Sequence, residues 1–186
     1  SSNIKLFERQ LVKNAQVMLQ SANAKVKLNA GRLYIDCDDE SAEAVKYTLD
    51  HLLGITGWSE AVVVEKNIEA IKKQVYKEAL KAKESGAKTF KIDSRRSDKS
   101  FPLDHYGICC EAPELVCKDD TLCVDVKNPD VVIMIEIRDR CFVYSDRNKG
   151  RRGLPAEVSG KGLLLLRGGL DSPVAGYRMM RRGMTV

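Results

Sequence analysis

Residues Leu163 to Ser172 read LLLLRGGLDS, and this stretch carries the clearest structural signal in the chain. The run Leu163–Leu166 is apolar on both faces, as a central strand of a parallel sheet covered on both sides requires. Gly168 and Gly169 let the backbone turn tightly with its N–H groups unobstructed. The stretch therefore predicts a buried strand that runs into a glycine-rich turn.

A helix is expected directly after this turn. Asp171 or Ser172 can cap it, Pro173 suits its first turn, and Gly183 is a usual stop. The exposed amides and the positive end of the helix dipole attract phosphate. Strand, turn and helix together predict a phosphate-binding site, although a Gly-Gly pair can also form a tight turn that binds nothing.

The composition is that of a globular protein. The chain has 186 residues, of which 44% are apolar and 31% are charged, and it contains no polar repeat. Its longest aliphatic runs, such as Val131–Ile135, are far shorter than the roughly 20 residues of a membrane span. The first ten residues show no secretory signal. We therefore expect a cytoplasmic protein without a membrane partner.

Positive charge is concentrated in two stretches. The net charge is only +5, but Lys88–Lys99 holds five cations and two anions, and Arg138–Arg152 holds six cations and two anions. Such clusters are typical of proteins that bind polyanions, and a solvated loop is the alternative.

The six cysteines are expected to be buried free thiols. Four of them follow the pattern CC-x6-C-x5-C, which lacks the C-x2-C pairing of zinc sites, and neither His51 nor His105 has zinc-finger spacing. We therefore predict no metal site.

Hydrophobic periodicity predicts a helix, a hairpin and a helix in the first 54 residues. The expected elements are a helix over Ile4–Ala22, strands around Val26–Leu28 and Leu33–Cys37, and a helix over Ser41–Leu53. Asn29 and Gly31 tolerate the positive φ of a hairpin turn, and Ser41 can serve as the N-cap of the second helix.

The next part of the chain mixes strands and helices without a simple βαβ period. We expect a buried strand at Ala61–Val64, a helix from Asn67 to Ser85, a strand at Thr89–Asp93, a loop at Ser94–Lys99, a helical segment after Pro102, and an antiparallel hairpin of Val131–Arg138 and Cys141–Tyr144. This order favours an α+β fold.

The glycine-rich turn resembles a known motif. The PP-loop of ATP pyrophosphatases reads S-G-G-x-D-S, and residues 168–172 match it, whereas Arg167 replaces its first serine. The order of segments is also similar to that of the tRNA 4-thiouridine synthetases of the ThiI type. The stretches that carry this likeness are Phe7–Asn14, Thr89–Lys91, Asp98–Pro102, Val124–Asp130, Glu136–Arg138, Lys149–Gly150, Gly153–Pro155 and Leu163–Gly183.

The resemblance implies an α+β chain of several parts. Residues 1–54 would form a ferredoxin-like domain whose first strand is missing, and residues 55–150 would form a THUMP RNA-binding domain. Residues 151–161 would be a linker, and residues 162–186 would be the first strand, loop and helix of a truncated α/β PP-loop domain.

The resemblance also implies a function. Members of this family use ATP with Mg²⁺ to adenylate a uridine carbonyl oxygen in tRNA. A persulfide donor such as a cysteine desulfurase then supplies sulfur, and the family is linked to thiamine biosynthesis and to a homodimer. The family's active cysteine lies beyond Val186, so we expect this chain alone to be inactive and to bind no cofactor. The alternative is a non-catalytic THUMP-type module with a vestigial PP-loop.

Two sets of residues follow as candidates for binding. The ATP-binding loop would be Arg167, Gly168, Gly169, Leu170, Asp171 and Ser172. The surface for the acceptor end of tRNA would be Lys91, Arg95, Arg96, Lys99, Phe101, Arg138, Arg147, Lys149, Arg151 and Arg152. In the second set the cations would contact phosphates and Phe101 would stack on a base.

Overall fold

The computed structural model describes residues 2–186, and these form two compact units. The first unit comprises the chain up to Trp58 together with Asn148–Val186, and the second comprises Ser59–Arg147. The finer division into four parts stays a prediction. No helix in the described part of the chain is long and apolar enough to cross a membrane.

The first unit begins with the expected helix, hairpin and helix. Its elements are α1 (Ser2–Met18), β1 (Ala24–Asn29), β2 (Arg32–Cys37), α2 (Ala42–His51) and β3 (Gly57–Trp58). The hairpin turns at Ala30 and Gly31, whose φ angles are 47° and 73°, whereas Asn29 stays in β1 and pairs with Arg32. Ala30 therefore takes the positive φ that we assigned to Asn29.

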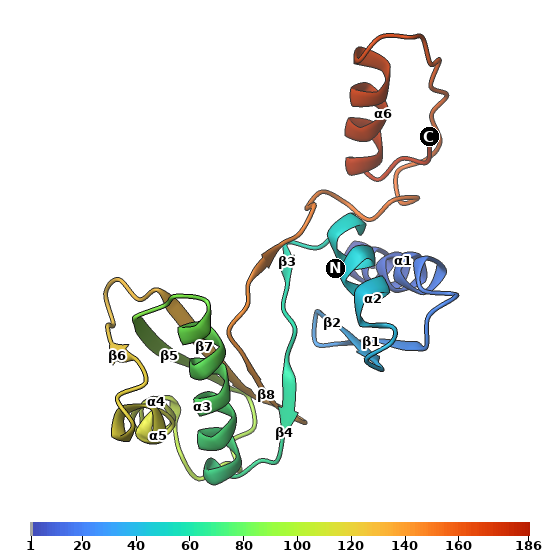
Figure 1. Ribbon diagram of the computed structural model, residues 1–186. Coiled ribbons are helices and arrows are strands. Elements are labelled where there is room, and N and C mark those ends of the chain that lie inside the picture. Colours follow the sequence, from blue (N-terminus) through green and yellow to red (C-terminus); the bar gives the residue numbers. More distant parts are fainter. Residues whose placement is uncertain (1) are drawn as a thin grey trace. The chain divides into compact units, whose positions relative to one another are not determined.

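The second unit is a five-stranded sheet covered by helices on one face (Figure 1). Its elements are β4 (Val62–Val64), α3 (Ile68–Glu84), β5 (Thr89–Arg96), α4 (His105–Glu111), α5 (Glu114–Lys118), β6 (Cys123–Val124), β7 (Val131–Ile137) and β8 (Cys141–Tyr144). The strand order is β4-β8-β7-β5-β6. β5 pairs in parallel with β6 and β7, and the remaining pairs are antiparallel. The α+β class is confirmed.

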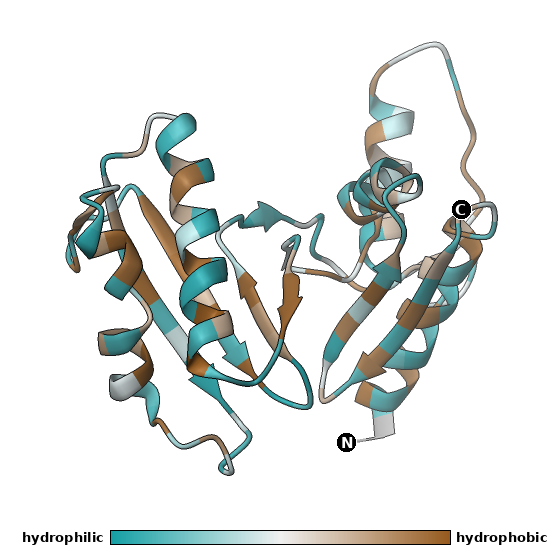
Figure 2. Ribbon diagram, turned by 60° about the horizontal axis from the view of Figure 1, so that its bottom comes forward, coloured by the Kyte–Doolittle hydropathy of each residue, from teal (hydrophilic) through white to brown (hydrophobic). Residues whose placement is uncertain are grey.

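The core of this unit lies between α3 and the sheet. Asn67 caps α3 as predicted, since its side chain accepts a hydrogen bond of 2.7 Å from the amide of Ala70. Ile71, Val75 and Phe90 are all fully buried in the same cluster. Hydrophobic residues form bands along the strands and on the facing helix (Figure 2). Burying each large side chain of this kind contributes about 1.5–3 kcal/mol.

Three expectations for the second unit are wrong in part. β4 is an edge strand whose Val63 is 47% exposed, so the Ala61–Val64 strand is not buried. β5 continues to Arg96 because β7 supplies pairing partners along that length, so the segment Ser94–Lys99 is a loop only after Arg96. The helical segment after Pro102 is two short helices, α4 and α5, separated at Ala112 and Pro113.

The strand predicted at Leu163–Leu166 does not form. Leu163, Leu165 and Leu166 are 89%, 76% and 70% exposed, and no described strand pairs with them. An apolar run becomes a strand only where neighbours satisfy its backbone groups and cover its side chains. In this segment only one isolated bridge forms, between Lys161 and Thr185.

The helix after the glycine-rich turn does form, as α6 (Asp171–Arg181). Its N-cap is Leu170 and makes no side-chain cap, so the capping that we expected from Asp171 or Ser172 is wrong. Gly183 follows the helix with a φ of +85°, as predicted for the stop. The remaining element is the short β9 (Asn148–Lys149), which pairs with β3 in the first unit.

The six cysteines are free thiols, but only Cys141 is buried. Cys37, Cys110, Cys117 and Cys123 are exposed, which corrects the expected burial. Cys123 is exposed because its short strand β6 lies at the edge of the sheet. Burial raises the pKa of the Cys141 thiol to about 11.

We predict that Cys141 resists alkylation in the folded chain. The thiolate is the reactive form, and a pKa raised to about 11 leaves very little of it at pH 8. With iodoacetamide, mass spectrometry should find Cys110 and Cys123 modified first and Cys141 modified only after urea is added. Equal rates for Cys141 and Cys123 in the folded chain would contradict the structure.

Candidate nucleic-acid interface

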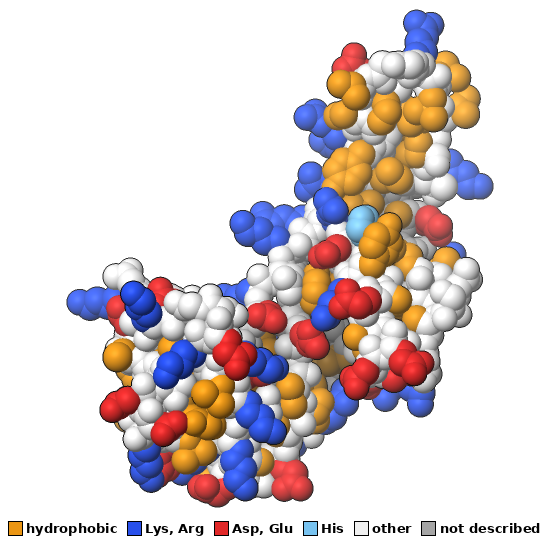
Figure 3. Space-filling view, viewed as in Figure 1, with side chains coloured by type: hydrophobic (Ala, Val, Ile, Leu, Met, Phe, Trp, Pro, Cys, Tyr) orange, Lys and Arg blue, Asp and Glu red, His pale blue; other side chains and the backbone are white. Residues whose placement is uncertain are grey.

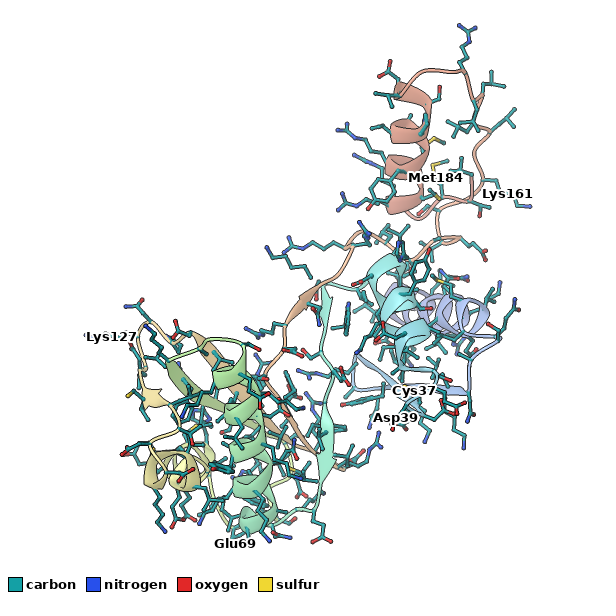
Figure 4. All side chains as sticks on the ribbon, in the orientation of Figure 1. Cys37, Asp39, Glu69, Lys127, Lys161 and Met184 are labelled. Atoms are coloured by element: carbon teal, nitrogen blue, oxygen red, sulfur yellow. The ribbon has the colours of Figure 1, made fainter. Side chains whose placement is uncertain are left out.

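The ends of β5 and β7 bring cations together at one edge of the second unit. We call this the basic edge and define it by the cations Lys66, Arg95, Arg96, Lys99, Arg138 and Arg140. Arg95 pairs with Glu136 and Arg96 with Ile137, and the amide of Ser97 then donates 2.9 Å to the carbonyl of Ile137. Glu69, near the start of α3, marks this end of the unit, and Lys127 marks the opposite end (Figure 4).

Strand alternation separates Arg95 from Arg96. Side chains of a strand point alternately to its two faces, and Ile92 and Ser94 are buried on the helix-covered face of β5. Arg96 shares their parity and therefore lies on that face. Lys91 and Arg95 lie on the other face, so the two neighbouring arginines cannot make equivalent contacts.

Arg96 holds the loop that follows β5. Its Nη1 donates 2.8 Å to the carbonyl of Phe101 and 3.2 Å to the carbonyl of Leu103. The loop thereby folds back so that Phe101 is only 5% exposed and belongs to the hydrophobic core. This corrects the sequence-based assignment of Phe101, because a buried ring offers no face for a base.

Asp98 anchors the same loop through an ion pair. Its carboxylate lies 2.8 Å from the Lys66 ammonium and accepts 2.9 Å from the amide of Ser100. These partners hold the pKa of Asp98 well below its usual range. The negative charge of Asp98 is therefore largely offset, while the neighbouring Lys99 is exposed.

The β7–β8 hairpin adds further cations to the edge. Arg138 lies 3.3 Å from Glu136, which is buried and also accepts 2.8 Å from the Tyr144 hydroxyl. Arg140 lies over the Phe142 ring at 5.2 Å. Lys66 and Arg140 were not among the cations predicted from the sequence. Lys66 could have been found because it directly precedes the N-cap of α3.

The remaining cations of the predicted surface are divided between the units. Arg147 ends the second unit, whereas Lys149, Arg151 and Arg152 belong to the first. In the first unit the amide of Arg152 donates 2.8 Å to the carbonyl of Ile55, and the Arg151 side chain donates 2.5 Å to the carbonyl of Asp50. Residues 151 and 152 are thus held by backbone carbonyls of α2 and of the segment that precedes β3.

The segment predicted as a linker is packed against α1. Asn14 donates 3.1 Å to the carbonyl of Ala156, and Lys13 lies 3.2 Å from the Glu157 carboxylate. The amides of Leu154 and Ser159 donate 2.9 Å and 2.8 Å to carbonyls at the end of α6. Residues 154–159 therefore connect the end of α6 to α1.

The expected ATP-binding loop is open on all sides. Arg167, Gly168, Gly169 and Leu170 are exposed, and a Cβ added to either glycine would meet no atom within 4 Å. A phosphate cradle requires amides enclosed by nearby walls. In this chain, residues 167–172 do not form such a cradle, and they fit ATP poorly as they stand.

The rest of this C-terminal segment leaves apolar side chains in solvent. Leu164 packs on Gly176, where an added Cβ would lie 2.6 Å from its Cδ2. Hydrophobic side chains gather on the visible face of the segment (Figure 3). At its base the chain returns on itself between Lys161 and Met184 (Figure 4), where the amide of Gly162 donates 2.7 Å to the carbonyl of Thr185.

Three protein-family profiles match successive parts of the chain. The ThiI ferredoxin-like domain matches residues 1–59, and the THUMP domain matches residues 65–146. The family described as thiamine biosynthesis protein (ThiI) matches residues 157–186.

Curated relatives match along the whole chain. A probable tRNA sulfurtransferase of Treponema pallidum (strain Nichols) is 46% identical over 99% of the chain, and one of Macrococcus caseolyticus is 40% identical over 100% of it. Each match covers 47% of the relative. The chain thus spans about half the length of the curated relatives it matches.

Two solved structures are similar to this chain along nearly its whole length. The structure of a 4-thiouridine synthetase in complex with RNA and ATP is similar with a TM-score of 0.88 and 33% identity, over 99% of this chain and 47% of that one. A structure from Pyrococcus horikoshii matches with a TM-score of 0.85 and 31% identity, over 97% and 60%.

We predict that Arg96→Gln loosens the loop after β5. Hydrogen bonds from a charged donor are worth about 1.5–3 kcal/mol, and glutamine cannot reach both carbonyls with the same geometry. Hydrogen exchange should accelerate roughly tenfold or more across residues 97–104. Arg95→Gln is the matched control, because Arg95 points to the other face. We call the two hydrogen bonds from Arg96 to the carbonyls of Phe101 and Leu103 the Arg96 clamp. Unchanged exchange in Arg96→Gln would show that this clamp is not needed to hold the loop.

We also predict that Gly150→Ala destabilises the first unit. An added Cβ would lie 2.4 Å from the carbonyl oxygen of Ile55, and relieving such an overlap typically costs about 1–3 kcal/mol. Urea unfolding should show this loss. Gly168→Ala, where the Cβ meets nothing within 4 Å, should stay within about 0.5 kcal/mol of the original chain. Equal stability of the two variants would argue against the close packing of Gly150 on the backbone of Ile55.

Proposed function

Because this chain belongs to the ThiI family of tRNA sulfurtransferases, we propose that it forms the tRNA-binding portion of an enzyme that makes 4-thiouridine in tRNA. The observation that carries the proposal is the basic edge. Arg95 and Lys99 are exposed there beside a loop whose conformation is fixed. Support also comes from the similar 4-thiouridine synthetase, which was solved with bound RNA.

The basic edge suits the RNA backbone. Guanidinium groups bind phosphate oxygens through paired N–H donors, and lysine adds a mobile point charge. This arrangement of cations suits the binding of the acceptor end of tRNA. Within the second unit the residues we propose for direct phosphate contact are Arg95, Lys99 and Arg138, with Lys91 and Arg147 as outer contacts. Lys149, Arg151 and Arg152 belong to the first unit and are proposed as separate phosphate contacts. Arg96 acts through the loop that it holds.

For the whole protein we propose the chemistry that the family implies. ATP would activate a uridine carbonyl oxygen by adenylation, which turns a poor leaving group into a good one, and sulfur would come from a persulfide donor. A link to thiamine biosynthesis and a homodimer belong to the same proposal. Residues 167–172 do not enclose a nucleotide, and we propose that the 186-residue chain alone binds tRNA without consuming ATP.

We predict that reversing the charge of Arg95 and Lys99 weakens tRNA binding. The double variant Arg95→Glu, Lys99→Glu should bind with lower affinity, and the slope of log K against log salt should become shallower by about 0.7–0.9 for each lost phosphate contact. Fluorescence anisotropy with labelled unmodified tRNA at several salt concentrations measures both quantities.

The matched control is Lys127→Glu, which reverses an exposed charge at the opposite end of the same unit (Figure 4). It should leave the salt slope nearly unchanged. The control reverses one charge and the double variant reverses two. If both lose the same affinity per reversed charge, the effect reflects net charge alone and the basic edge is not the binding surface. If the original chain does not bind tRNA, the proposed function itself fails.

A further inference from the structure

We propose that Tyr106 is the aromatic residue on which an unpaired base of the bound RNA stacks. This inference rests on the proposed tRNA binding. Proteins that bind unpaired nucleotides combine cations for the phosphates with exposed aromatic rings for the bases. The sequence offers Phe101 for that role, but its ring is 5% exposed, whereas Tyr106 is 75% exposed. Among the described aromatic residues Tyr106 has the largest exposed fraction.

Tyr106 lies in the first turn of α4, and α4 starts at the basic edge. The carbonyl of Leu103, three residues earlier, accepts the 3.2 Å hydrogen bond from Arg96. Asp104 then caps the helix by accepting 2.8 Å from the amide of Gly107. The Arg96 clamp therefore fixes both the loop that buries Phe101 and the start of the helix that carries Tyr106.

The preceding residue fixes the first turn of α4 to β5. Nδ1 of His105 lies 2.7 Å from the Ser94 hydroxyl and 2.9 Å from the Ser94 carbonyl. Bonding to the carbonyl requires a proton on Nδ1. Ser94 directly precedes Arg95 on β5, and its side chain lies on the helix-covered face, opposite to Arg95. The helix turn that carries Tyr106 is therefore tied to β5 on the face where Arg96 holds the loop.

Cys110 lies one turn further along α4 than Tyr106, and its side chain raises the pKa of the Tyr106 phenol. The phenol is therefore neutral at physiological pH and does not repel phosphates. A tyrosine side chain presents a large flat surface with few freely rotating bonds, which lowers the entropy lost when a base stacks on it.

An isolated exposed aromatic residue is common on protein surfaces and needs no partner. Tyr106 differs because its backbone is tied to β5 on one side and to the Arg96 clamp on the other. Stacking on Tyr106 would favour unpaired over paired nucleotides, because only an unstacked base exposes its face.

The test compares Tyr106→Ala with Tyr106→Phe in the 186-residue chain. The probes are two labelled RNA hairpins that copy a tRNA acceptor stem, one with an unpaired 3′ end and one blunt-ended. Loss of one stacked base costs about 1–3 kcal/mol, so Tyr106→Ala should bind the first RNA roughly 5- to 150-fold more weakly. The blunt RNA should bind this variant and the original chain equally.

Two further readouts separate stacking from charge. Tyr106→Phe keeps the ring and should bind like the original chain, and the salt slope of Tyr106→Ala should stay unchanged because no cation is removed. Tyr47→Ala is the matched control, since Tyr47 is 65% exposed on α2 of the other unit, and its affinity should stay unchanged. Thermal unfolding should confirm that each variant is folded.

The inference is overturned if Tyr106→Ala binds the overhanging RNA as tightly as the original chain, or if Tyr106→Phe is as weak as Tyr106→Ala. In either case the charge-reversal variant still reports on the proposed function independently. If neither RNA binds the original chain, the proposed function and this inference fail together.

Discussion

The parallel pairing of β5 with β7 is the constraint on which the basic edge depends. At the start of these strands the Asp130 carboxylate accepts 2.8 Å and 3.0 Å from the amides of Lys88 and Thr89, while the amide of Asp130 donates 3.0 Å to the Thr89 hydroxyl. This reciprocal contact sets the register at one end of the sheet. At the other end the same register places Arg95 opposite Glu136. A shift by one residue would exchange the two faces of β5.

The same register gives neighbouring arginines different tasks. Arg96 turns toward the helices and satisfies two loop carbonyls, whereas Arg95 turns to the other face and is exposed. Charge counting along the sequence found this basic stretch but could not separate the two roles, because the strand was expected to end at Asp93. Phe101 shows the same limit, since its contact with the core depends on the Arg96 clamp and not on local periodicity.

The ends of helices were predicted well where a single residue decides the backbone conformation. Asn67 caps α3, and Gly183 follows α6 in the left-handed region, both as expected. Apolar runs were less informative. Val62–Val64 and Leu163–Leu166 are both aliphatic, yet the first is an exposed edge strand and the second is no strand at all. Whether a strand is buried depends on the segments that cover it, and a run of three or four apolar residues carries no information about those segments.

The glycines of the C-terminal segment fall into two groups. Two belong to the motif that indicates the family, and two others determine the conformation of the backbone. Gly168 and Gly169 match the PP-loop pattern but have open space around them, and a Cβ added to either would meet no atom within 4 Å. Gly153 and Gly183 lie outside the PP-loop pattern, yet both have positive φ and lie against a neighbouring segment. The motif glycines would become necessary only where phosphate and surrounding walls approach their backbone. The local fold of this segment is therefore maintained by residues that the motif does not contain, and the motif alone is no measure of nucleotide binding.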